Sequence, residues 1–551
     1  MEHIRGNLVR ILQQQICFAE LEVDEGRIKK INVLEEREAP GQPYILPGFI
    51  DSHVHIESSM LVPAEFARLA VVHGTVATVS DPHEIANVCG VEGVNYMIEN
   101  GKTVPFKFNF GAPSCVPATD FETAGATLGV TEVTELLARK EIKYLAEMMN
   151  FPGVLMGDAT VMDKIKAAHK ARKPVDGHAP GLRGDDARKY AAAIADPAAG
   201  LRGTDHECFT REEALDKLSA GMKILIREGS AAKNFEALIG LLNDHPDAIL
   251  FCSDDKHPDS LVEGHINQLC ARAVEKGIAV FKVLKAACIN PILHYNLDVG
   301  LLEEGDPADF ILVKDLVRFE VEATWISGRL VAQNGKTLIK AEKAPLLNHF
   351  NCTLKTPDLF KMPVTADKAI PVIEALDGQL ITNKLFLTPG ILDGFYVSDS
   401  SQDLLKIAVV NRYQDAVIAV AFIRNTGLKK GAIASSVAHD SHNIIAVGVD
   451  DESLCRAVNK IITEKGGVSA VTDEEEQIVP LPVAGLMSNE DGYTVATAYA
   501  QIDQMAKRMG STLTAPFMTL SFMALLVIPA IKLSDKGLFD GEKFTFIAET
   551  G

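Results

Sequence analysis

The chain has 551 residues, of which 54 are Lys or Arg and 74 are Asp or Glu, so its formal net charge is −20 at pH 7. This length predicts about two to four domains, and the acidic balance argues against nucleic acid as a partner, because phosphate binding requires a basic surface. The nine cysteines lack the spacing of a disulfide framework or a zinc ribbon, which indicates a reducing, cytoplasmic setting. We expect no membrane partner, since the most apolar segment, Pro516 to Ile531, is shorter than the ~20 residues of a spanning helix.

Short strands and turns are predicted for residues 1–45, which are too few for a core of their own. Similar strands return at 309–314 and 323–332. We therefore expect a small β-sandwich domain built from both flanks of the chain's central part, residues 1–45 and 297–340.

Between these flanks, short apolar runs alternate with amphipathic helical stretches, a pattern typical of a parallel sheet built from βα units. The predicted strands are 45–51, 75–80, 106–110, 143–147, 174–177, 201–205, 223–226 and 248–253. The predicted helices are 64–72, 90–100, 131–140, 163–171, 186–195, 211–220, 232–243 and 264–276. Eight units in about 250 residues predict a (β/α)8 TIM-type barrel over residues 46–296, rather than an open doubly wound sheet.

From residue 350 to 551 we predict a separate C-terminal α/β domain, with a boundary near the polar, irregular stretch 340–357. Its predicted strands are 408–411, 416–422 and 444–448, and its predicted helices are 452–464 and 494–509.

Potential metal ligands follow nearly every predicted barrel strand, at the edge where such barrels carry their chemistry. His53 and His55 follow the first strand and, two residues apart, point to the same side. The other strand ends carry Ser80-Asp-Pro-His-Glu84, Ser114, Glu147, His178, Asp205-His-Glu207, Arg227 and Ser253-Asp-Asp255.

These groups are more than one metal ion needs, so we predict two divalent ions that share a bridging carboxylate. The predicted ligands are His53, His55 and Asp254 for one ion, His178 and His206 for the other, and Glu147 as the bridge. Imidazole with carboxylate suits zinc, manganese or iron. The ions would lower the pKa of a bridging water enough to supply hydroxide near neutral pH. Asp254 would accept its proton, with Asp255 as the alternative ligand.

The run Pro47-Gly-Phe-Ile-Asp-Ser-His-Val-His55, with the later single histidines and aspartate, resembles the amidohydrolase superfamily. More narrowly, four motifs resemble its bacterial adenine deaminase branch: His55-Ile-Glu-Ser-Ser-Met60, Asp81-Pro-His-Glu-Ile-Ala-Asn-Val88, Ser253-Asp-Asp-Lys-His-Pro258 and Ala438-His-Asp-Ser-His-Asn443. Many relatives carry a carboxylated lysine on strand four, and Glu147 there fits the adenine deaminase branch, which is associated with manganese or iron.

The resemblance implies hydrolytic deamination of adenine to hypoxanthine and ammonia, as in purine salvage, by attack of hydroxide on C6. Its small-molecule partners would be adenine and water, and we expect a homo-oligomer. A proton must reach a ring nitrogen, and Glu84, His83 and Glu207 are the candidate donors. The predicted catalytic residues are therefore Asp254, Glu147 and Glu84. The predicted substrate-binding residues are His83, Glu84, Glu207, Asp255, Ser114 and Arg227.

Three alternatives stay open from the sequence. His439 and His442 could bind metal or reach over the barrel mouth, or belong to an ordinary polar loop. The chain could be a cyclic amidase of the hydantoinase or dihydroorotase kind, although Glu147 and the large C-terminal domain disfavour this. It could also be an inactive barrel that serves as a scaffold, although such proteins lose metal ligands.

Overall fold

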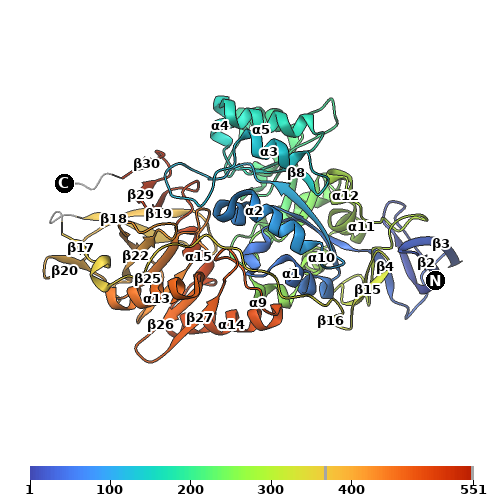
Figure 1. Cartoon of the computed structure of the whole chain (residues 1–551). Coiled ribbons are helices and arrows are strands. Elements are labelled where there is room, and N and C mark those ends of the chain that lie inside the picture. The colour runs from blue at the N-terminus through green and yellow to red at the C-terminus, as the bar shows by residue number, and fades with distance from the viewer. Residues whose placement is uncertain (365–368, 548–551) are drawn as a thin grey trace.

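The structure is a computed structural model, and it describes residues 1–364 and 369–547. Figure 1 shows the N-terminal strands at one end of the molecule, the barrel elements in the middle and the C-terminal sheet at the other end. No helix within the described ranges combines the length and the apolar character that crossing a bilayer requires.

The central part is a barrel of parallel strands, which confirms the predicted fold class. Its strands are β5 (Phe49–Val54), β6 (Thr75–Ser80), β7 (Lys107–Ala112), β8 (Ile142–Met148), β9 (Val175–Gly177), β10 (Thr204–Asp205), β11 (Lys223–Arg227) and β12 (Ile249–Cys252). β5 to β9 pair in order, as do β10 to β12. The ring closes where the Asp254 amide donates to the His53 carbonyl at 2.9 Å. Between β9 and β10 a Cβ on Gly177 would lie 2.3 Å from the Thr204 carbonyl oxygen, so a glycine is required for this close approach.

Helices alternate with these strands. They are α1 (Pro63–Ala70), α2 (His83–Gly101), α3 (Val130–Leu137), α4 (Phe151–Met156), α5 (Ala159–Lys170), α6 (Gly184–Ile194), α7 (Arg211–Ser219), α8 (Phe235–Leu238), α9 (Pro258–Glu263), α10 (Ile266–Glu275), α11 (Val280–Leu284) and α12 (Asn290–Tyr295). α2 begins at His83, before the predicted start at Gly90, and consists of two helical segments joined at Gly90, whose φ of 61° and ψ of −145° are not helical. At its start the Asp81 carboxylate accepts the His83 amide at 3.0 Å. This earlier start places His83 and Glu84 in the first turn, beside the barrel rim.

Strands from the two flanks of the barrel form one eight-stranded sheet in the order β16-β15-β14-β13-β4-β1-β2-β3. They are β1 (Glu2–Arg10), β2 (Gln15–Asp24), β3 (Arg27–Glu35), β4 (Tyr44–Pro47), β13 (Phe310–Val313), β14 (Val321–Ile326), β15 (Arg329–Gln333) and β16 (Lys336–Thr337). β2 alternates buried and half-buried residues, which is typical of a sheet with one covered face, whereas β6 is buried throughout.

The C-terminal part contains a second eight-stranded sheet in the order β19-β18-β23-β22-β25-β24-β26-β27. The strands beyond residue 360 are β17 (Met362–Pro363), β18 (Ile370–Ala375), β19 (Thr382–Leu387), β20 (Gly390–Leu392), β21 (Phe395–Val397), β22 (Leu404–Val410), β23 (Ala419–Arg424), β24 (Ala432–Ser435), β25 (Ile444–Gly448), β26 (Gly467–Val471), β27 (Glu476–Pro480), β28 (Ile531–Ser534), β29 (Gly537–Asp540) and β30 (Thr545–Phe546). The helices are α13 (Asp451–Glu464), α14 (Gly492–Arg508) and α15 (Pro516–Phe522). The apolar segment singled out in the sequence forms the buried α15 and the loop after it.

Candidate active site

The six side chains predicted as metal ligands meet at the carboxyl ends of the barrel strands. They are His53, His55, Glu147, His178, His206 and Asp254, and each is at most 6% exposed. The first two lie at the end of β5, Glu147 lies near the end of β8, and the others follow β9, β10 and β12. The βα repeat therefore brings segments 200 residues apart to one rim.

The Glu147 carboxylate lies at the centre of this cluster. Its Oε2 is 3.0 Å from His178 Nδ1 and 3.0 Å from His206 Nε2. Asp254 Oδ1 lies 3.3 Å from His55 Nε2 and 3.6 Å from His53 Nε2. The donor atoms of His53, His55 and Asp254 all lie within 4.8 Å of one another.

This spacing fits ligand atoms that share a cation. Two ligands at about 2.1 Å from an ion, in octahedral or tetrahedral directions, are about 3.0–3.4 Å apart. The nitrogens His53 Nε2 and His55 Nε2 are 3.2 Å apart. His55 Nδ1 donates to the Asp81 carbonyl oxygen at 3.2 Å, which leaves the Nε2 lone pair free for a metal. The residues present therefore fit divalent metal.

Electrostatics favour an ionised carboxylate at this centre. Burial opposes ionisation of Glu147, but His178 and His206 outweigh it and hold the pKa of Glu147 well below its usual value. An ionised carboxylate has lone pairs on both oxygens and no proton to donate, so in this state it can bind a cation.

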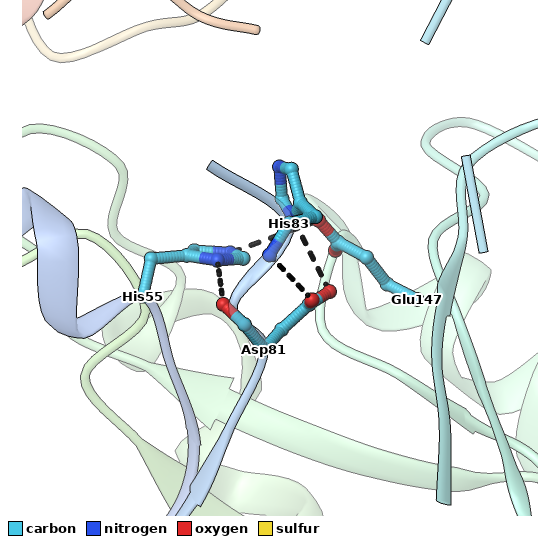
Figure 2. A group of neighbouring side chains, drawn as sticks. All are labelled: His55, Asp81, His83 and Glu147. Carbon is cyan, nitrogen blue, oxygen red and sulfur yellow. Dashed lines mark hydrogen bonds and ion pairs between the residues drawn. The ribbon is translucent and has the colours of Figure 1, made fainter. Parts of the chain in front are cut away.

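Figure 2 shows a further group of potential ligands, His55, Asp81, His83 and Glu147, whose donor atoms also lie within 4.8 Å of one another. His83 Nδ1 is 3.1 Å from Asp81 Oδ2 and 3.5 Å from Glu147 Oε1. The sequence predicts His83 at the substrate and assigns no role to Asp81. The signal for Asp81 was its place directly after β6, at a strand end.

Arg227 sits between two acidic groups of the site. Its Nη1 is 2.7 Å from Asp254 Oδ2, and its Nη2 is 3.0 Å from Glu207 Oε2. Glu207 Oε1 in turn lies 3.3 Å from His206 Nε2. Arg227 Nη1 also contacts this Glu207 Oε1, so the arginine binds both oxygens of Glu207 and one oxygen of Asp254.

Two other predicted substrate contacts have different surroundings. Asp255 lines the site cavity, and its Oδ1 accepts a hydrogen bond from the Ser58 hydroxyl at 2.5 Å. Ser114 does not line that cavity, and its hydroxyl donates to the Glu147 carbonyl oxygen at 2.5 Å. Ser114 therefore contacts the strand that carries Glu147.

The C-terminal part of the chain covers the site with apolar side chains. Leu380, Phe522 and Leu525, here called the roof, line the same cavity as the histidines and carboxylates. The cavity that these groups line has a volume of about 30 Å³. A second cavity of about 840 Å³ shares Met149 with the site.

Glu84 contacts two histidines of the C-terminal part. Its Oε1 is 2.5 Å from His439 Nδ1, and its Oε2 accepts a hydrogen bond from His442 Nε2. Burial opposes the ionisation of Glu84, but His439 and His442 hold its pKa well below the usual range. Burial lowers the pKa of His439, but the Glu84 carboxylate outweighs this effect and raises it to about 9. From the sequence, the role of both histidines stays open.

Comparison with known proteins identifies the family. The amidohydrolase family model matches residues 44–331, and the adenine deaminase C-terminal domain model matches residues 379–545. An adenine deaminase of Salinibacter ruber is 54% identical over 546 residues, covering 99% of this chain and 98% of that protein. One of Sulfurovum sp. is 54% identical over 545 residues and one of Methanosarcina acetivorans 50% over 557, each covering 99% of both chains. The chain therefore belongs to the adenine deaminase family of amidohydrolases.

Proposed function

We propose that this chain catalyses the hydrolysis of adenine to hypoxanthine and ammonia at a site that holds two divalent metal ions. The observation that supports this most is the convergence of four imidazoles on the carboxylates of Glu147 and Asp254. Family membership supplies the substrate class. The setting we propose is a cytoplasmic homo-oligomer that acts on free purine bases and binds no nucleic acid.

We assign the ligands in two sets with a shared bridge: His53, His55 and Asp254 for one ion, His178 and His206 for the other, and Glu147 between them. We propose that both ions are manganese(II) or iron(II), with zinc(II) as the third candidate, because imidazole and carboxylate ligands together suit all three metals. Ions held there would lower the pKa of a bound water so that hydroxide is available near neutral pH.

The chain's own groups then direct the reaction. Water adds across the C6–N1 bond of adenine, with its oxygen on C6 and one proton on N1. The bond to the exocyclic nitrogen then breaks, and ammonia leaves with the second proton of that water. Asp254 Oδ1 takes a proton from the attacking water and passes it to the leaving nitrogen, while Arg227 holds the other oxygen of this carboxylate. Glu84 faces the purine ring from the first turn of α2, and the roof excludes bulk water.

The test is ammonia release from adenine by wild type and by His53→Ala, with manganese, iron or zinc supplied. We expect His53→Ala to lose more than about 100-fold in kcat/KM and to hold less metal, because even outer partners of metal ligands are worth about 10–100-fold. His169→Ala, on α5, is the matched control. Hydrolysis of hydantoin or dihydroorotate but not of adenine would favour the cyclic amidase, and a protein that purifies without metal and without activity would favour a scaffold.

A further inference from the structure

A loop of the C-terminal part reaches into the barrel site. Residues 436–443 connect β24 to β25, and His439, Asp440 and His442 on this loop are at most 4% exposed. His439 and Asp440 line the same cavity as Glu84 and the barrel histidines. Residues 84 and 439 are 355 positions apart in the chain, so the contact between them is a tertiary one.

The two imidazoles hold both oxygens of one carboxylate. His439 Nδ1 binds Glu84 Oε1 at 2.5 Å, and His442 Nε2 binds Oε2. His442 Nδ1 accepts a hydrogen bond from the Ala438 amide at 3.2 Å, which makes its Nε2 the protonated nitrogen that donates to Glu84. With one donor on each oxygen, rotation of the carboxylate plane is blocked.

We propose that His439 and His442 are positioning residues, which fix the Glu84 carboxylate against the purine ring so that the C-terminal domain completes the active site. This inference rests on the proposed function. A carboxylate that is held on both oxygens keeps its remaining lone pairs aimed into the cavity, where a ring N–H can meet them. Such preorganisation matters most for the transition state, because a free carboxylate would have to be oriented during the reaction.

The two contacts use different ring nitrogens, and this permits a sharp test. The side-chain amide nitrogen of asparagine lies where histidine has Nδ1, and that of glutamine reaches where histidine has Nε2. His439→Asn and His442→Gln therefore keep the donor to Glu84, whereas His439→Gln and His442→Asn misplace it. His439→Leu and His442→Leu remove it without β-branching, which suits the positive φ of 54° at His442.

The measurements are kcat and KM for adenine, bound metal, and the affinity for the product hypoxanthine. We expect the leucine variants to lose about 10–100-fold in kcat, the range found for outer partners of metal ligands, with KM and metal content changed much less. His439→Asn and His442→Gln should recover most of this loss, whereas His439→Gln and His442→Asn should not. In a Glu84→Gln background the leucine changes should have little further effect, because their partner is already altered.

Each of these measurements either supports or contradicts the positioning role of His439 and His442. The inference is overturned if the leucine variants keep wild-type kcat, if the swapped amides restore kcat as well as the matched ones, or if the losses multiply with that of Glu84→Gln. Should a leucine variant fail to fold, the four amide variants still carry the comparison, since they are similar in size and polarity. Wild type without activity on adenine would refute the proposed function instead, and is measured first.

Discussion

The barrel rim and the C-terminal part line one cavity in different ways. The rim places ionisable groups where each faces another: Glu147 faces His178 and His206 at 3.0 Å each. The C-terminal part contributes the apolar roof and a loop whose His439 binds the Glu84 carboxylate. The rim thus supplies reactive charge, and the C-terminal part supplies enclosure and orientation. The variants below test whether the two regions separate in this manner.

The largest expected effect comes from breaking a charge pair on the rim. Arg227→Met leaves Glu207 and Asp254 as buried carboxylates without their cation. We expect the free energy of unfolding of the metal-free protein to fall by about 3–5 kcal/mol, the usual cost of stranding a buried charge. Urea unfolding measures it. Arg211→Met is the matched control, because its partner Asp244 is exposed and such pairs are worth about 1 kcal/mol or less. Equal losses would show that burial at the rim carries no special cost.

An intermediate effect is expected beneath the roof, where a buried amine holds two roof residues. Lys532 Nζ donates to the carbonyl oxygens of Leu380 at 2.5 Å and of Phe522 at 2.9 Å, and burial lowers the pKa of Lys532 to about 7. The unfolded lysine keeps its proton up to about pH 10.4. Between these values the unfolded state binds the extra proton, so stability rises with pH, by up to about 1.4 kcal/mol per unit from this group.

Lys532→Met should flatten that dependence, which urea midpoints at pH 7, 8 and 9 would reveal. The exposed Lys340 offers the control, and Lys340→Met should keep the wild-type slope. Parallel slopes for wild type and Lys532→Met would contradict the prediction.

The smallest expected effect concerns the roof itself. Phe522→Leu removes an aromatic face from the cavity, and we expect KM for adenine to rise about 2–10-fold with kcat nearly kept, since an aromatic contact is worth about 0.5–1.5 kcal/mol. Steady-state kinetics measure this. Phe517→Leu, also buried on α15 but outside the cavity lining, controls for packing. A fall in kcat alone would mean that the roof acts in orientation, like the loop.

Much of the barrel could be predicted because its pattern is local. β6 begins and ends at the predicted residues, since a run rich in β-branched residues lies there between Gly74 and Asp81. β10 is shorter than predicted, with only Thr204 and Asp205 paired, because pairing also depends on the neighbouring strand. The part of α2 before Gly90 was not predicted, because no apolar periodicity marks it in the sequence. Its first amide, that of His83, is bound by the Asp81 carboxylate.

The sequence alone determined that eight strands alternate with helices and that histidines and carboxylates follow the strand ends. It could do so because parallel strands place equivalent positions at one edge. Only the tertiary structure decided that Arg227 lies between Asp254 and Glu207, that Leu380 and Phe522 cover the site, and that Glu84 meets His439. Those contacts join elements with no common period, so their partners follow from how separate sheets pack and not from spacing along the chain.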